Sequence, residues 1–208
     1  MYKCIIFDVD GTLIDTESVI LRTYQELMKT KKNKHYEIED LKFTMTMTGE
    51  DSFIALGFED MDEATNDFNA ILINHLDELI PFDGMSETIE SLRENNVLLG
   101  VVTSRVHDEL VADFDRAWPD NYFEAIICAD DTDHHKPHPE PLELFFRATG
   151  IRKEESVYIG DTHTDAKCAK AAGVDFLLAG WGAGDMQDES YTRIETPAEI
   201  LKYVNVSK

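Results

Sequence analysis

The stretch Cys4-Ile5-Ile6-Phe7-Asp8-Val9-Asp10-Gly11-Thr12 determines how the rest of the chain is interpreted. Four consecutive apolar residues are typical of a parallel strand that is buried on both faces. Side chains alternate along a strand, so Asp8 and Asp10 point to one side and Val9 to the other, and Gly11 allows a sharp turn. Two carboxylates this close repel each other unless they share a proton or bind a cation. Since Mg²⁺ prefers oxygen ligands, the pattern favours a magnesium site over a solvated acidic turn.

Further apolar runs typical of strands recur along the chain, at residues 4–7, 97–102, 125–129, 157–159 and 176–179. Segments with a helical pattern separate most of them, at residues 86–95, 108–116, 141–149 and 165–172. Strands that alternate with helices of this length indicate βαβ units. We therefore expect an α/β fold with a doubly wound, Rossmann-like parallel sheet, closed by a short amphipathic helix at residues 197–208.

Residues 15–80 interrupt this alternation, because they contain no convincing strand pattern. Helical patterns occur there at residues 17–31, 51–56 and 63–79. The segment is too long for a single crossover helix, and Pro81 and Gly84 mark the return to the sheet. We expect a core domain of residues 1–14 and 81–208 and an inserted helical cap domain of residues 15–80.

The composition excludes several classes of partner. The chain has 208 residues, with 19 basic and 42 acidic side chains and a formal net charge of -23. Nucleic acids and anionic membranes bind basic surfaces, so neither is expected as a partner. Three widely spaced cysteines argue against a disulfide framework. No signal segment precedes the first strand and no apolar stretch reaches about 18 residues, so we expect a cytoplasmic protein. Oligomeric state has no signal in the sequence.

Polar residues follow the other expected strands at the points where ligands bind open α/β sheets. Thr103 and Ser104 follow the second strand, and their hydroxyl and amide groups suit phosphate oxygens. Lys136 lies in the stretch after the third strand. The fourth strand is followed by Asp161, with Asp165 four residues later. With the acidic pair of the first strand, these residues predict a combined Mg²⁺ and phosphate site.

The motifs resemble those of the haloacid dehalogenase-like (HAD) hydrolase superfamily, in particular its phosphatases with a helical cap. The matching motifs are Asp8-x-Asp10-Gly11-Thr12-Leu13-x-Asp15, Thr103, Lys136 with the prolines that follow it, and Gly160-Asp161-x-x-x-Asp165. Two later stretches, Ala171-Ala172-Gly173-Val174 and Gly180-Trp181-Gly182, are similar to the phosphoglycolate-phosphatase-like branch. The resemblance implies a Mg²⁺-dependent hydrolase of a small phosphorylated metabolite, with phosphoglycolate as the first expectation.

The resemblance also implies roles for the acidic residues. Asp8 would attack phosphorus and form an aspartyl-phosphate, and Asp10 would act as general acid and base. The Asp8 side chain, the Asp10 main-chain carbonyl and Asp161 would hold Mg²⁺. Asp165 would orient metal-bound water or the lysine.

The same resemblance implies that the phosphoryl oxygens are held by Thr103, Ser104 and Lys136. Lys136 would also offset the charge that develops in the transition state.

Several alternatives stay open. A sugar phosphomutase of the β-phosphoglucomutase type shares all these residues, but it needs a basic cap residue for a second phosphate. Residues 44–49, the nearest match to that cap loop, contain no arginine or lysine, which favours hydrolysis. Pyrophosphate, a sugar phosphate and a nucleotide are alternative substrates. A role in binding alone is disfavoured because every motif residue is present. His134, His135 and His138 are expected as loop residues rather than as a transition-metal site.

Overall fold

A single parallel sheet forms the centre of the larger part of the molecule. The computed structural model describes residues 1–47, 49–110, 114–184 and 190–205. The strands of the sheet are β1 (Cys4–Phe7), β2 (Leu98–Val102), β3 (Ala125–Ile127), β4 (Ser156–Gly160), β5 (Asp175–Ala179) and β6 (Thr192–Ile194). They lie in the order β3-β2-β1-β4-β5-β6 and every neighbouring pair is parallel. The prediction of an α/β fold with a parallel sheet is confirmed.

The register of the sheet places the predicted polar residues side by side. Phe7 of β1 pairs with Val101 of β2 and Ile159 of β4. All residues of β1 are fully buried, as the uninterrupted apolar run predicts. Because the carboxyl ends of β1, β2 and β4 meet at one edge of the sheet, the residues that follow these strands come together there.

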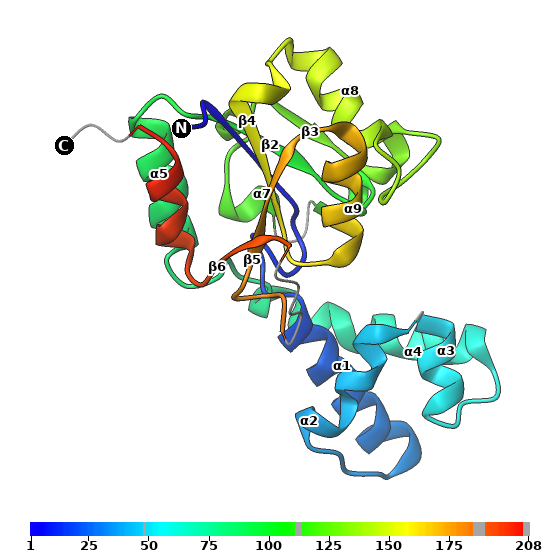
Figure 1. The fold of residues 1–208 in the computed structure, drawn as a ribbon. Coiled ribbons are helices and arrows are strands. Elements are labelled where there is room, and N and C mark those ends of the chain that lie inside the picture. Colours follow the sequence, from blue (N-terminus) through cyan, green and yellow to red (C-terminus); the bar gives the residue numbers. More distant parts are fainter. Residues whose placement is uncertain (48, 111–113, 185–189, 206–208) are drawn as a thin grey trace. The chain divides into compact units, whose positions relative to one another are not determined.

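Helices cover both faces of this sheet (Figure 1). The four elements concerned are α5 (Met85–Glu94), α8 (Glu140–Thr149), α9 (His163–Ala172) and the 3₁₀ helix η6 (Pro197–Tyr203). Helices α8 and α9 pack on one face, where Phe145 and Cys168 join Ile6 and Tyr158 in one buried cluster. Helix α5 and η6 lie together on the other face. The sheet is therefore doubly wound.

One expected helix lies partly outside the described residues, and another takes a different form. Residues 108–116 are expected as one helix, but residues 111–113 lie outside the described part of the chain. The short helices α6 (His107–Leu110) and α7 (Phe114–Ala117) flank them. At the C-terminal end the expected α-helix is the 3₁₀ helix η6, and Val204 then pairs with Tyr2 in an isolated parallel bridge.

The remaining short elements of the core are all 3₁₀ turns in connections between strands and helices. They are η3 (Asp120–Tyr122), η4 (Ala129–Asp131) and η5 (Lys153–Glu155).

The turn after β1 is closed by its own backbone. The carbonyl oxygen of Val9 accepts hydrogen bonds from the amides of Thr12, Leu13 and Ile14, at 3.2, 2.8 and 3.0 Å. Ile14 then pairs with Pro81 in an isolated antiparallel bridge, and the Phe82 amide donates to the Leu13 carbonyl at 3.1 Å. The segments that lead out of the core and back into it are thus hydrogen-bonded to each other.

The chain divides into two compact units, one of residues 1–15 and 81–208 and the other of residues 16–80. Within the second unit the described residues form helices and turns and no strand. Its elements are α1 (Glu17–Lys32), α2 (Ile38–Leu41), η1 (Lys42–Thr46), α3 (Gly49–Ala55), α4 (Met61–Leu72) and η2 (Ile73–Glu78). The unit has a core of its own, in which the rings of Tyr24, Phe53 and Phe68 lie within 5.8 Å of one another, centroid to centroid.

Among the described helices, none combines the length and the apolar character needed to cross a membrane.

Candidate active site

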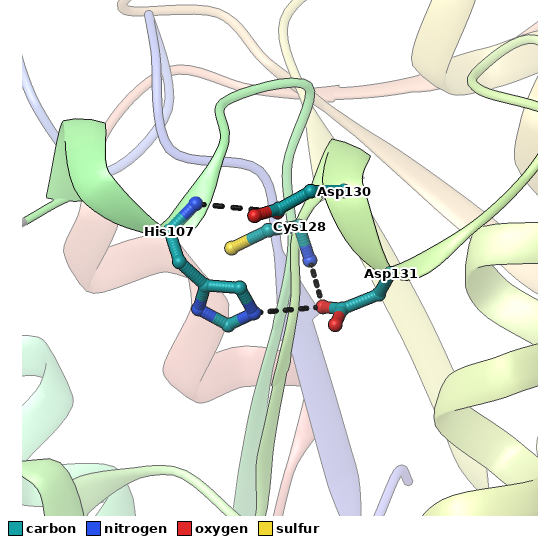
Figure 2. Close-up of side chains that lie close together, drawn as sticks. All are labelled: His107, Cys128, Asp130 and Asp131. Carbon is teal, nitrogen blue, oxygen red and sulfur yellow. Dashed lines mark hydrogen bonds and ion pairs between the residues drawn. The ribbon is translucent and has the colours of Figure 1, made fainter.

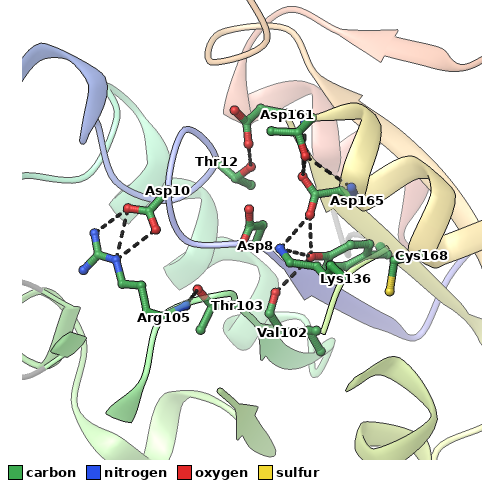
Figure 3. Close-up of polar contacts among 12 residues, drawn as sticks. Asp8, Asp10, Thr12, Val102, Thr103, Arg105, Lys136, Asp161, Asp165 and Cys168 are labelled. Atoms are coloured by element: carbon green, nitrogen blue, oxygen red, sulfur yellow. Dashed lines mark hydrogen bonds and ion pairs between the residues drawn. The ribbon is translucent and has the colours of Figure 1, made fainter. Parts of the chain in front are cut away.

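A buried lysine joins two carboxylates at the carboxyl ends of β1 and β4. The Nζ atom of Lys136 lies 2.9 Å from Oδ1 of Asp8 and 2.6 Å from Oδ1 of Asp165 (Figure 3). The exposed fractions of these three side chains are 3%, 9% and 0%. An ion pair at this depth is screened little by solvent, so each carboxylate holds the lysine firmly in place.

Tyr158 of β4 is the third side chain that contacts the ammonium group of Lys136. Its hydroxyl oxygen lies 3.1 Å from Nζ of Lys136, 3.0 Å from Oδ1 of Asp165 and 2.9 Å from the carbonyl oxygen of Val102. The hydroxyl accepts from the ammonium group and donates to one of the two oxygens. Asp8 directly after β1, Tyr158 in β4 and Asp165 in α9 therefore position Lys136 together.

Asp165 is fixed by the helix that carries it. Thr162 is the N-cap of α9, and its hydroxyl accepts a hydrogen bond from the Asp165 amide at 3.2 Å. In return, Oδ2 of Asp165 accepts from the Thr162 amide at 3.1 Å, which closes a capping box. Both oxygens of Asp165 are thus engaged, one by Lys136 and one by Thr162.

Asp161 approaches the turn after β1 closely. Its Oδ1 accepts a hydrogen bond from the hydroxyl of Thr12 at 3.1 Å. A Cβ atom placed on Gly11 would lie only 2.2 Å from Oδ2 of Asp161, and Gly11 has a φ of +71°. Only glycine satisfies both conditions. The glycine of the Asp-x-Asp-Gly motif therefore admits the carboxylate that follows β4 to the end of β1.

Burial dominates the electrostatics of the acidic residues. It raises the pKa of Asp8 well above its usual range, and the opposing attraction of Lys136 does not cancel the effect. Burial, reinforced by Asp165, also raises the pKa of Asp161 to about 7. For Asp165 the balance is reversed: burial again raises its pKa, but the charge of Lys136 and the hydrogen bonds from Lys136 and Thr162 together outweigh it, so its pKa is lowered. Among these three carboxyl groups, the lysine therefore lowers the net pKa of Asp165 only.

We define Asp8, Lys136, Asp161 and Asp165 as the nucleophile cluster, named for the role that the sequence motif leads us to expect of Asp8. Carboxylate oxygens of its three acidic residues lie within 4.8 Å of one another. This all-oxygen donor set, in which one lysine faces three carboxyl groups, fits a hard divalent cation such as Mg²⁺.

Asp10 does not point toward Lys136 but forms an ion pair with Arg105 (Figure 3). The Nε atom of Arg105 lies 3.0 and 2.9 Å from the two oxygens of Asp10, and Nη2 lies 2.6 Å from Oδ1. The arginine side chain is 12% exposed and that of Asp10 is 43% exposed. Sequence reasoning missed Arg105, although it directly follows Thr103-Ser104 and is a cation close to the expected phosphate site.

A family model for haloacid dehalogenase-like hydrolases matches residues 5–179. The chain belongs to this family. A pyrophosphatase PpaX of Halalkalibacterium halodurans is 30% identical over 199 residues, which cover 95% of this chain and 91% of that protein.

Solved structures agree with this assignment to the HAD hydrolases. One described as a "putative phosphoglycolate phosphatase" of Lactobacillus plantarum has a TM-score of 0.77 and 28% identity, covering 98% of this chain and all of that one. A HAD-superfamily hydrolase of subfamily IA, variant 1, from Geobacter sulfurreducens has a TM-score of 0.81 and 26% identity, with 98% and 97% covered.

The phosphate-binding residues expected for a HAD hydrolase occupy different environments. Thr103 is buried, and its hydroxyl accepts a hydrogen bond from the Arg105 amide at 3.2 Å. Ser104 is exposed in the same turn. Lys136 belongs to the nucleophile cluster. The described structure therefore brings Lys136 against Asp8, while Thr103 and Ser104 lie in the turn that carries Arg105.

The histidines beside Lys136 make contacts in their own loop. Nδ1 of His134 lies 2.7 Å from Oε2 of Glu140, and the rings of His134 and His138 stack at 4.6 Å. His135 is exposed and is not part of this group. The contacts join the start of α8 to the loop before it.

A second glycine contact fixes the turn after β1. Nε1 of Trp181 donates to the carbonyl of Thr12 at 2.9 Å, and a Cβ on Gly182 would lie 1.7 Å from the carbonyl oxygen of Gly11. Trp181 and Gly182 therefore pack directly on the motif turn, and the contact with Gly11 leaves no room for a side chain at position 182.

Proposed function

We propose that the chain is a Mg²⁺-dependent phosphatase that hydrolyses a small phosphorylated metabolite through a phosphoaspartate on Asp8. The observation that carries the proposal is the buried ion pair between Asp8 and Lys136, with Asp161 beside it. A carboxylate and an ammonium group side by side can serve as nucleophile and as anchor for a phosphoryl oxygen. Membership of the HAD hydrolases supports the same reaction class.

In the first half of the proposed reaction, an oxygen of Asp8 attacks phosphorus. A bond forms between that oxygen and phosphorus, and the bond from phosphorus to the leaving oxygen breaks. Asp10, in its protonated form, gives its proton to the leaving oxygen. Lys136 and the groups of Thr103 and Ser104 hold the non-reacting phosphoryl oxygens and offset their charge.

In the second half, water attacks the phosphorus of the phosphoaspartate. Asp10, now ionised, accepts a proton from the water, and the bond to Asp8 breaks. Inorganic phosphate leaves and both carboxyl groups return to their starting states. Arg105 pairs with ionised Asp10, so before the first half Asp10 must turn from the guanidinium group toward the phosphoryl group and take up a proton from solvent.

The side chains of Asp8 and Asp161 and the main-chain carbonyl of Asp10 are the proposed Mg²⁺ ligands. When bound, the ion supplies positive charge that keeps Asp8 ionised and neutralises phosphoryl oxygens. Since both oxygens of Asp165 are engaged by Lys136 and Thr162, its proposed role is to position the lysine.

Two substrate classes are favoured. The stretch Gly180-Trp181-Gly182 and the fold relative from Lactobacillus plantarum support phosphoglycolate. The relative from Halalkalibacterium halodurans carries the name pyrophosphatase, which supports pyrophosphate as second candidate. A third candidate is another activity, that of a sugar phosphomutase. It is disfavoured because residues 44–49 contain no basic side chain to hold a second phosphate.

A turnover assay over a panel of phosphate compounds tests these proposals. The panel contains phosphoglycolate, pyrophosphate, several sugar phosphates and nucleotides, each with Mg²⁺ and with a chelator. We expect release of inorganic phosphate that stops with the chelator and returns with added Mg²⁺. Full activity without metal would contradict the metal requirement. Sustained conversion of a hexose 1-phosphate into the 6-phosphate with little free phosphate would favour the mutase.

A further inference from the structure

A second group of potential metal ligands lies at the ends of β2 and β3, outside the proposed phosphatase machinery. It consists of His107, at the start of α6, and of Cys128, Asp130 and Asp131 in the turn after β3 (Figure 2). One ligand atom from each residue lies within 4.8 Å of the corresponding atoms of the other three. We call this group the β3 cluster.

The backbone of the two turns orients these side chains. Oδ2 of Asp131 lies 3.0 Å from Nε2 of His107 and accepts from the Cys128 amide at 2.8 Å. Oδ1 of Asp130 accepts from the His107 amide at 3.2 Å. The two turns are also joined directly, since the Ala129 amide donates to the Arg105 carbonyl at 2.8 Å. A carboxylate has about four acceptor positions, so these bonds orient the groups and leave room for a ligand.

The thiol lies at the inner end of the β3 cluster. Cys128 is 1% exposed, whereas His107, Asp130 and Asp131 are exposed. The turn that carries Cys128 is closed by its own backbone, since the Asp131 amide donates to the Cys128 carbonyl at 3.2 Å. The exposed side chains on the outer side leave an ion a path to the buried sulfur.

The electrostatic field at the thiol has the sign that attracts cations. Burial, followed by the charges of Asp131, Asp130, Asp115 and Glu109, raises the pKa of Cys128 to about 12. The carboxylates that disfavour a second negative charge at this point favour a positive one. The sign of the electrostatic field and the arrangement of the ligand atoms therefore both favour a bound cation.

We propose that His107, Cys128, Asp130 and Asp131 bind one divalent transition-metal ion of the Zn²⁺ type. A thiolate, an imidazole and two carboxylates are ligands that Zn²⁺ accepts, and four of them fill its tetrahedral shell. Hard Mg²⁺ is not expected here, because it avoids sulfur. Binding releases the thiol proton of Cys128 to solvent, and the ion replaces it on the sulfur.

A bound ion would link the segment after β2 to the turn after β3, because its ligands come from both. The segment after β2 carries Thr103 and Arg105, the residue that holds Asp10. The proposed site thus stabilises the segment from which a phosphate-binding group and the partner of the general acid extend.

Titration with Co²⁺ tests the site, because a thiolate ligand gives a near-ultraviolet charge-transfer absorption that oxygen ligands do not. The full-length chain is titrated in saturating Mg²⁺, so that the oxygen ligands of the nucleophile cluster are occupied. We expect the absorption to saturate at one equivalent of Co²⁺ and to disappear on addition of Zn²⁺. Cys128→Ser should abolish it.

A matched control is Cys168→Ser, since Cys168 is also buried and its sulfur donates to the His138 carbonyl, a bond that serine keeps. This variant should retain the absorption. His107→Ala and Asp131→Asn change exposed positions and should weaken Co²⁺ binding by at least about 10-fold. If circular dichroism shows that Cys128→Ser does not fold, His107→Ala and Asp131→Asn test the site in its place. Absence of the absorption in the folded wild-type chain, or its retention in Cys128→Ser, would overturn the proposal.

Discussion

The nucleophile cluster and the β3 cluster stand at neighbouring strand ends of one sheet, and each gathers acidic side chains within 4.8 Å of one another. They differ in the group that lies among the carboxylates, which is a buried lysine in the first cluster and a buried thiol in the second. Lys136 of the nucleophile cluster is 3% exposed, and the only basic member of the β3 cluster, His107, is 52% exposed. A buried lysine among carboxylates prepares a place for an anion as well as a metal ion. A thiol among carboxylates prepares a place for a metal ion alone. From this difference we expect the partner of the carboxylates, more than their number, to decide the chemistry.

The largest effect is expected when the nucleophile itself is changed. Asp8→Asn should reduce turnover by at least about 10⁴-fold, because an amide is a poor nucleophile and a weaker metal ligand. Asp131→Asn, in the β3 cluster, should leave Mg²⁺-dependent turnover nearly unchanged. Steady-state kinetics on one substrate compare the two variants. Comparable losses in both would show that the two clusters are not distinct in function.

A smaller and substrate-dependent loss is expected for Asp10→Asn. The proposed metal contact of Asp10 is its main-chain carbonyl, so Mg²⁺ affinity should be kept. The loss of the general acid should reach about 10²- to 10⁴-fold for esters with poor leaving groups and be smaller for nitrophenyl esters. Rates over a series of leaving groups measure this dependence. An equal loss for every ester would leave the acid–base role of Asp10 unsupported.

The buried lysine should matter for stability, unlike a surface lysine. Lys136→Met leaves Asp8 and Asp165 close together without their counter-charge, and we expect a loss of about 3–5 kcal/mol in the free energy of unfolding. Lys3→Met is the matched control, because Lys3 is 69% exposed and pairs with Glu155 at 2.7 Å. This exposed pair should contribute about 0–1 kcal/mol. Urea denaturation measures both, and equal losses would contradict the contrast.

Metal binding and pH should be linked through Asp161. Its pKa is about 7 in the folded chain, raised by burial and then by Asp165 from a usual value of 3.8. A raised pKa stabilises the fold fully at pH values below the unfolded pKa, and this contribution is lost as pH rises through about 7. Mg²⁺ needs the ionised form. The increase in Tm caused by Mg²⁺ should therefore be larger at pH 8 than at pH 5.5, and Asp161→Asn should reduce this difference. A Tm increase that is independent of pH would contradict the linkage.

The smallest effect is expected at the exposed pair of the β3 cluster. Without a transition metal, Asp131→Asn should change the free energy of unfolding by about 1 kcal/mol or less, because the ion pair with His107 faces solvent. With one equivalent of Zn²⁺ the wild-type chain should become more stable than the variant, as ligand linkage requires. Thermal unfolding with and without Zn²⁺ measures the difference. Equal shifts in both proteins would place the ion elsewhere.

Sequence reasoning succeeded where local pattern and burial agree. Cys4–Phe7 is apolar throughout and is the fully buried central strand, so its bounds match the prediction. It missed Thr192–Ile194, the edge strand β6. Three residues with two polar side chains give no apolar run, and only pairing with β5 defines the strand.

The candidate site, like the fold, was predictable in part from the sequence. The strand ends that carry Asp8 and Asp161 follow from the apolar runs before them. The contact of Arg105 with Asp10 spans 95 residues of sequence, and no local pattern distinguishes this arginine from others in turns. The β3 cluster was missed for the same reason, since His107 and Cys128 come from separate turns that only the sheet brings together.

The bridge between Ile14 and Pro81 has a consequence for how such enzymes diversify. The chain segments on either side of the insertion are hydrogen-bonded to each other. The inserted residues are therefore a loop whose two ends are held together within the core domain. Doubling the length of a flexible loop costs only about 0.6 kcal/mol in closure entropy. Inserted sequences of very different size can therefore be exchanged at this junction while the sheet and its strand ends keep their geometry. A grafted module from a relative with another specificity is an experiment that this junction permits.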